Sequence, residues 1–134
     1  MSKHTIFKAI VYLFLLFLAV FALVFWFIYN GEQSRDYQRL GDLKIIQSEM
    51  ADYFAQYNTY VIPECNPEMT IDQCVGKGDR HLANSKFFDP INSGNYRYIV
   101  KSLSDDDFAI QFYLEAGVSK VIPGGYLWTK NGKQ

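Results

Sequence analysis

The sequence predicts an α+β protein in which a long N-terminal helix, transmembrane in its first half and amphipathic in its second, packs on a small three- to four-stranded antiparallel sheet. Two patterns carry this expectation. An uncharged apolar run near the N-terminus is followed by apolar residues at helical spacing, and from Tyr96 onward apolar and polar residues alternate as they do in strands. A small sheet with one apolar face needs a cover, which the apolar face of the helix supplies.

A continuous apolar run of 21 residues without a charge extends from Ala9 to Tyr29. A helix of that length, rising about 1.5 Å per residue, crosses the hydrocarbon core of a bilayer, which is about 30 Å thick. The alternative is a signal peptide cleaved near Ala22, but the apolar region of a signal peptide normally spans only about 7–15 residues. The run is therefore interpreted as a retained membrane anchor.

Charged residues are distributed unevenly around this run. Lys3 and Lys8 lie before it or at its start, and the first 31 residues contain no acidic residue. Because basic flanks stay on the cytoplasmic side, we expect residues 1–8 in the cytoplasm, a transmembrane helix at 9–29 and an extracytoplasmic domain at 30–134. That domain carries 14 acidic and 11 basic residues, a net charge of −3. Such a balance excludes the strongly basic surface typical of nucleic-acid-binding proteins.

From Ser34 to about Asn58 the pattern is that of an amphipathic helix. Apolar side chains recur at intervals of three and four residues and so share one face, namely Leu40, Leu43, Ile46, Met50, Tyr53, Phe54 and Tyr57. The charged residues are expected mostly elsewhere on the circumference, namely Arg39, Asp42, Lys44, Glu49 and Asp52. Ser34 and Asp36 are residue types that commonly begin helices. Asn30-Gly31 either kinks one long helix or separates two, and we favour one nearly continuous rod.

Cys65 and Cys74 are the only cysteines of the chain and lie nine positions apart. In an oxidising compartment outside the membrane, two such cysteines indicate one disulfide bond. Free thiols and a metal site are the less favoured alternatives, the latter because it needs two further ligands. The bond would lie in residues 59–95, a stretch whose proline and glycine residues predict an irregular connection. A connection that long benefits from a covalent link.

Three strands are predicted in the C-terminal part. The first alternates at Tyr96, Tyr98 and Val100, and the second alternates at Phe108, Ile110, Phe112 and Leu114. The residues 104–107 join these two runs and are typical of a hairpin loop. The third strand, at residues 126–129, follows two glycines and ends at Asn131-Gly132.

No group of residues in the sequence supports catalysis, so we expect a protein that is not an enzyme and that has no cofactor or metal. There is no serine–histidine–acid pattern and no glycine-rich phosphate loop, and His81 is the only histidine after the membrane segment. The acidic cluster Asp105, Asp106 and Asp107 is interpreted as a solvated turn. The alternative is an interaction site, including cation binding assisted by another loop, because hard cations need several converging oxygen ligands.

Several of these segments resemble type IV pilins and the pseudopilins of type II secretion systems. The resemblance in the helix lies at Arg35-Asp36, Arg39, Asp42-Leu43, Ile46-Gln47, Met50, Tyr53 and Tyr60. Later segments similar to the family are Asp89-Pro90, Tyr96-x-Tyr98, Phe108-Ala109-Ile110 leading into Leu114-Glu115, and Gly125-Tyr126 to Asn131-Gly132. The resemblance implies a pilin-like fold and a protein that acts by contact with other proteins.

The N-terminus departs from that family's pattern. Family members carry a short basic leader that ends in glycine, and a glutamate five residues into the mature helix. Residues 3–8 contain no glycine, and the apolar run contains no glutamate. The resemblance therefore implies an unprocessed accessory protein rather than a major filament subunit, in the cytoplasmic membrane of a prokaryote. Its partners would be the bilayer and either pilin or secretion-machine subunits or a second copy of itself.

The alternative from another class is a stand-alone tethered domain that binds an external ligand, surface or cation. Its contact sites would be the Cys65–Cys74 loop and the hairpin of residues 105–107. A membrane-bound enzyme is the least favoured hypothesis, because no candidate nucleophile and base are paired in the sequence.

Overall fold

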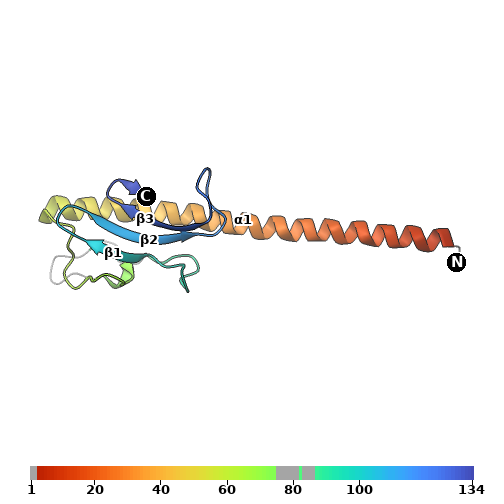
Figure 1. Cartoon of the computed structure of the whole chain (residues 1–134), viewed down its shortest axis with the longest axis horizontal. Coiled ribbons are helices and arrows are strands. Elements are labelled where there is room, and N and C mark those ends of the chain that lie inside the picture. Colours follow the sequence, from red (N-terminus) through yellow and green to blue (C-terminus); the bar gives the residue numbers. More distant parts are fainter. Residues whose placement is uncertain (1–2, 75–81, 83–86) are drawn as a thin grey trace.

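The structure is a computed structural model that describes residues 3–74, 82 and 87–134. It consists of the helix α1 (Lys3–Tyr57), the short 3-10 helix η1 (Ile71–Gln73), and the strands β1 (Ile99–Leu103), β2 (Phe108–Leu114), β3 (Gly124–Thr129) and β4 (Gly132–Lys133). The first half of α1 projects from the domain as a free rod, and its second half lies along the sheet (Figure 1). This α+β layout confirms the predicted fold class.

The helix α1 is a single element of 55 residues and passes through Asn30-Gly31 without a break. One glycine in a helix costs only about 1 kcal/mol relative to alanine, which is too little to end a helix that long apolar and polar runs support on both sides. The prediction of one nearly continuous rod is therefore confirmed. The alternative, in which Asn30-Gly31 separates two helices, is wrong.

The C-terminal end of α1 is closed by a residue in the left-handed conformation. Asn58 has φ 55°, and its N–H donates to the carbonyl oxygen of Phe54 at 2.7 Å. Asparagine tolerates this conformation better than most residues, so it ends the helix close to the predicted position.

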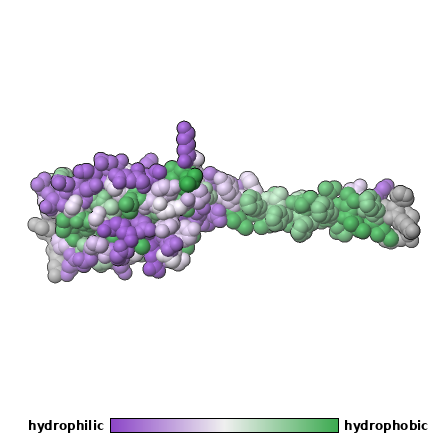
Figure 2. Space-filling view, in the orientation of Figure 1, coloured by the Kyte–Doolittle hydropathy of each residue, from purple (hydrophilic) through white to green (hydrophobic). Residues whose placement is uncertain are grey.

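The projecting rod is apolar on all sides. Every large apolar side chain that the structure describes from Ile6 to Tyr29 is exposed, and none of the most hydrophobic part of the helix is buried by the rest of the protein. Figure 2 shows the rod as a hydrophobic segment beside a domain of mixed polarity. One helix near the N-terminus is thus long and apolar enough to cross a membrane, as a single-pass membrane protein requires.

The four strands form one antiparallel sheet in the order β1-β2-β3-β4. Strand β2 is central, and its side chains alternate without exception between the core and the outer face. Its buried side chains pack with the apolar face of α1 in one core, which includes Leu43, Ile46, Met50, Tyr53, Phe108, Ile110, Phe112 and Leu114. The sheet and the helix therefore cover each other, as the sequence predicts.

Strand β1 begins three residues later than the alternation of the sequence predicts. Tyr96 does not pair with β2, because its N–H closes a turn with the carbonyl oxygen of Ser93 at 3.0 Å. Regular pairing starts with Ile99, which lies opposite Gln111. The ring of Tyr96 packs against Tyr113 instead, with ring centroids 6.5 Å apart.

Candidate functional site

A buried ion cluster joins α1 to the domain near the point where the rod leaves it. Its centre is Arg39, whose side chain is fully buried. The guanidinium holds Asp89 with two parallel bonds, Nε to Oδ2 at 2.6 Å and Nη2 to Oδ1 at 2.9 Å. Its third nitrogen, Nη1, donates to Asp36 and to Glu115, both at 2.7 Å. One arginine thus binds three carboxylates that lie far apart in the sequence.

Asp36 binds the end of β2 as well as Arg39. Its Oδ1 accepts a bond from the N–H of Glu115, and its Oδ2 accepts bonds from the N–H groups of Ala116 and Gly117, at 2.8–2.9 Å. Three successive backbone donors converge on this one carboxylate. The first residues of the β2–β3 loop are therefore fixed to the helix.

Glu115 also forms an ion pair with a second arginine, Arg35. Arg35 donates from Nε to Oε1 of Glu115 at 2.7 Å and from Nη2 to Oε2 at 2.5 Å. This bond to Arg35, more than the bond to Arg39, lowers the pKa of Glu115 although burial opposes the shift. Burial also disfavours the charge of Arg39, but its bonds to Asp89, Glu115 and Asp36 outweigh burial and raise its pKa. Both groups are therefore charged at neutral pH.

The cluster is closed and fully paired. The guanidinium of Arg39 also lies over the ring of Tyr96, 4.9 Å from its centroid. In the part of the chain that the structure describes, no buried polar side-chain atom is without a hydrogen-bond partner. Each carboxylate of the cluster accepts at least one bond from an arginine. The cluster fixes the orientation of the domain on the helix.

The sequence did not reveal this cluster. Arg39 was expected on the polar circumference of the helix with four other charged residues, and for Arg39 that expectation is wrong. It lies on the buried face, where three carboxylates compensate its charge. The one local signal is the spacing of Asp36 and Arg39, which places them on one side of the helix; their partners are 50 and more residues away.

A second polar link lies further along α1. The hydroxyl of Tyr98 donates to Oδ2 of Asp42 at 2.9 Å. Burial is the main cause that raises the pKa of both groups. Asp42 therefore joins the helix to the residue just before β1, rather than facing solvent as its position in the charged set suggested.

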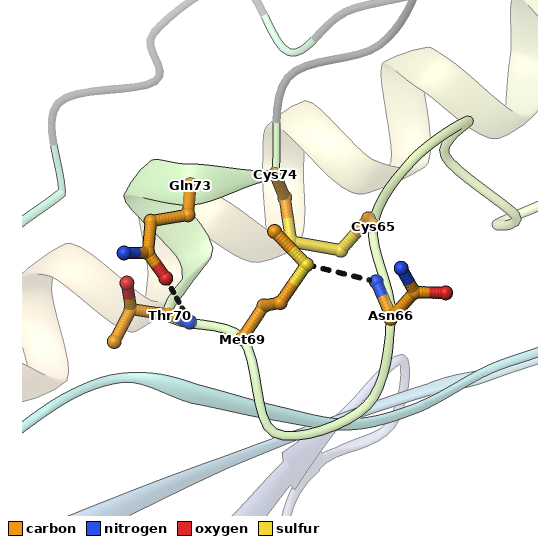
Figure 3. The surroundings of a disulfide bond; sticks show 6 residues. All are labelled: Cys65, Asn66, Met69, Thr70, Gln73 and Cys74. Atoms are coloured by element: carbon orange, nitrogen blue, oxygen red, sulfur yellow. Dashed lines mark hydrogen bonds between the residues drawn. A yellow bond between two sulfur atoms is a disulfide. The ribbon is translucent and has the colours of Figure 1, made fainter.

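The predicted disulfide bond between Cys65 and Cys74 is present, and both sulfur-bearing side chains are buried. Figure 3 shows the loop that it closes, with two internal bonds: Asn66 N–H to the sulfur of Met69 and Thr70 N–H to Oε1 of Gln73. No free cysteine occurs, and the metal alternative for this pair is thereby excluded.

The disulfide loop covers the outer edge of β1. Residues 68–71 run beside this strand. Two backbone bonds join them to β1, Glu68 N–H to Val100 O and Val100 N–H to Met69 O, both at 2.8 Å, and a third joins Ile71 N–H to the oxygen of Tyr98, just before the strand, at 2.9 Å. Lys101 adds an ion pair with Glu68 at 2.8 Å. An uncovered sheet edge is a site of unwanted pairing, so the loop protects this edge.

The acidic hairpin joins β1 to β2 at the end of β2 away from the ion cluster. Its aspartates bond mainly to residues in and around this turn. Asp105 accepts a bond from the hydroxyl of Thr59 at 2.8 Å. Oδ1 of Asp107 accepts bonds from the N–H groups of Phe108 and Lys130, and the backbone oxygen of Asp106 accepts one from Nζ of Lys130. The contacts tie the hairpin to its neighbours, and its role as an interaction site stays a prediction.

Among the residues that the structure describes, no three histidine, cysteine, aspartate or glutamate side chains are placed to hold a metal ion. His81 lies outside the described residues. An open hollow of about 270 Å³ occurs on the face of the sheet away from α1, lined by Gln111, Tyr113, Gly125, Tyr126, Leu127 and Gln134. This lining carries no charged side chain and does not select a ligand class.

Comparison of the chain with protein-family models, with curated proteins and with solved structures finds no match.

Proposed function

We propose that this chain is a membrane-anchored, non-enzymatic protein that acts by protein–protein contact in or beside a type IV pilus or a type II secretion system. Residues 9–29 lie in the cytoplasmic membrane of a prokaryote with the N-terminus inside, and the domain lies outside. The observation that carries the proposal is α1 itself. One helix is an exposed apolar rod in its first half and part of a folded core in its second.

The continuity of α1 supports a role in assembly rather than simple tethering. A tether needs only a flexible link between anchor and domain. Here the rod enters the domain without a linker, and the ion cluster fixes it there through Asp36 and Arg39. A domain held rigidly on a membrane helix has a defined position relative to any neighbour that packs against that helix.

The residues that carry the pilin resemblance also support the proposal, because they converge in space. Arg35-Asp36 and Arg39 come from the helix, Asp89 from the central connection and Glu115 from the end of β2. In the folded chain they form one ion cluster. The similarity therefore covers residues that cooperate in one structural task.

Site-specific photo-crosslinking in the native membrane tests this function. A photoreactive phenylalanine analogue replaces Phe17 in the middle of the rod or Phe25 near its outer end, both of which are exposed. We expect crosslinks to other single-pass subunits or to the assembly platform, identified by mass spectrometry. The matched control places the same analogue at Gln56, which is exposed near the other end of α1.

Crosslinks from both rod positions to lipid alone, with full insertion of the chain, would contradict a role in assembly. They would leave the tethered binding domain as the better hypothesis. In that alternative the ligand would bind the disulfide loop or the hairpin of residues 105–107. Deletion of the segment that binds it would then abolish ligand capture. The rigid joint between rod and domain is the observation that favours the first hypothesis.

A further inference from the structure

Several exposed apolar residues lie at the end of the domain from which the rod emerges. Beyond Tyr29, the described part of the chain exposes seven large apolar side chains: Tyr37, Ile45, Val61, Phe88, Ile91, Ile122 and Leu127. Four of the seven lie on segments tied to the ion cluster. Tyr37 adjoins Asp36 in α1, Phe88 and Ile91 flank Asp89, and Ile122 lies in the β2–β3 loop. We call this end of the domain the base.

Ile122 is the most exposed of these side chains, at 72%. The loop that presents it is tightly built. Val118 and Val121 exchange backbone bonds at 3.0 and 2.9 Å, and Gly117 has φ 83°. A Cβ at Gly117 would lie 2.3 Å from the carbonyl oxygen of Val121, so the chain returns directly over this glycine. Ile122 is thus held outward by a fixed turn.

The base lies immediately next to the apolar run. The described residues from Ile6 to Asn30 are exposed, whereas residues 31–33 are half-buried, so packing starts without a spacer. Asp36, which binds the β2–β3 loop, lies about 10 Å beyond Tyr29 along the helix. The headgroup layer extends about 5–8 Å beyond the hydrocarbon core. Transmembrane helices tilt by about 20° on average, and tilting a straight α1 toward the loop brings the loop into that layer.

The charge of the base also suits contact with the membrane surface. Lys120 is exposed on the turn, two residues from Ile122. Three carboxylates of the base, Asp36, Asp89 and Glu115, are buried or nearly so and are paired with arginines, and a fourth, Glu32, is half-buried and attracts Arg35. A basic side chain beside an apolar one is the combination that binds anionic lipid surfaces. Figure 2 shows a hydrophobic patch beside a hydrophilic projection at this end of the domain.

We propose that the β2–β3 loop is a second membrane contact, in which Ile122 enters the headgroup layer and Lys120 binds anionic lipid headgroups. The domain then rests on the bilayer with its base and holds α1 at one tilt. This inference rests on the proposed membrane anchoring, and it adds a surface by which the lipid sets the orientation of the whole domain.

Depth measurement with spin labels on the full chain in vesicles of phosphatidylcholine and phosphatidylglycerol tests the inference. A label at Ser119→Cys reports on the loop, one at Val61→Cys on an exposed site near the far end of α1, and one at Val20→Cys on the apolar run. The paired cysteines are buried and bonded, so the label reacts with the introduced thiol. We expect the label at position 119 to lie at the depth of the headgroups, the label at position 61 in water and the label at position 20 in the hydrocarbon core.

Substitution of the two contact residues supplies the decisive comparison. Ile122→Ser should reduce the lipid-bound population of the loop by about tenfold. Lys120→Gln, or vesicles without phosphatidylglycerol, should reduce it by about fivefold. Both variants should keep the wild-type urea midpoint because the two side chains are exposed. A label at 119 that reads water, with 20 in hydrocarbon, would overturn the second contact alone. A label at 20 that reads water would overturn membrane anchoring itself.

Discussion

Arg39 and Asp89 form a two-bond ion pair in which both side chains are fully shielded from solvent. The pair joins α1 to the irregular segment that precedes β1, 50 residues later in the chain. It therefore fixes the position of the domain on the helix.

Removing the arginine should destabilise the domain strongly. Arg39→Met keeps an apolar stem but leaves Asp36 and Asp89 buried with an unpaired charge, which should cost about 3–5 kcal/mol. Urea unfolding in detergent micelles measures this change, followed by the fluorescence of Trp128 in a Trp26→Phe background. Lys44→Met, at an exposed site of the same helix, is the control and should change stability by less than about 0.5 kcal/mol. Equal midpoints for the two variants would mean that the ion cluster does not hold the domain.

Stability should fall in acid, and Glu115 should be one cause. The pKa of Glu115 is lowered in the folded state from its ordinary value of 4.5, first by the bond from Arg35. Its contribution is therefore present above about pH 4.5 and is lost as the pH falls through the lowered pKa. Unfolding midpoints between pH 7 and 3 should decline less steeply for Glu115→Gln than for the wild type.

Asp42 should act in the opposite direction. Burial raises its pKa in the folded state, so its charge costs stability at neutral pH and protonation in acid relieves that cost. Asp42→Asn removes the relief while keeping an acceptor for Tyr98. Its unfolding midpoints should therefore decline more steeply than those of the wild type over the same pH range, and a shallower decline would refute the sign argued from burial.

Removal of the disulfide bond should loosen one edge of the sheet. Replacing Cys65 and Cys74 by alanine should cost about 2–3 kcal/mol through the entropy of the unfolded chain. The N–H of Val100, which bonds to Met69 in the disulfide loop, should exchange with solvent faster than the amides of β2. Native-state hydrogen exchange of the two forms compares these sites. Uniform acceleration of all strand amides would instead indicate a purely global effect.

The same substitution at two glycines should have opposite signs. Gly41→Ala adds a Cβ that meets nothing within 4 Å inside a helix, and should stabilise by about 0.5–1 kcal/mol. Gly117→Ala adds one that collides with the backbone of Val121 at a φ of 83°, and should destabilise by more than about 2 kcal/mol. The urea midpoints of the two variants check this contrast. Similar midpoints would show that the β2–β3 turn yields easily.

The parts of this fold that local periodicity determines were predictable from the sequence. The alternation over Phe108–Leu114 places every buried residue of β2 correctly, and the helical spacing from Leu43 to Tyr53 gives the core face of α1. The disulfide bond followed from two isolated cysteines. In each case the signal lies within a few residues of the structure that it predicts.

The ion cluster and the covered edge of β1 were not predictable in that way. Glu115 lies 76 residues from Arg39, and a charged residue seen alone is expected in solvent. Its burial depends on partners that only the folded chain brings together. Similarly, residues 68–71 show no strand pattern in the sequence. They pair with β1 because they lie in the loop that the disulfide bond closes.

We propose that the apolar half of α1 lies in a bilayer, and alkaline carbonate extraction of cell membranes that contain the full chain is the experiment to apply. We expect the protein to remain in the membrane pellet, since 21 uncharged residues span the hydrocarbon core. Release of the wild-type protein into the carbonate supernatant as a monomer would contradict the claim.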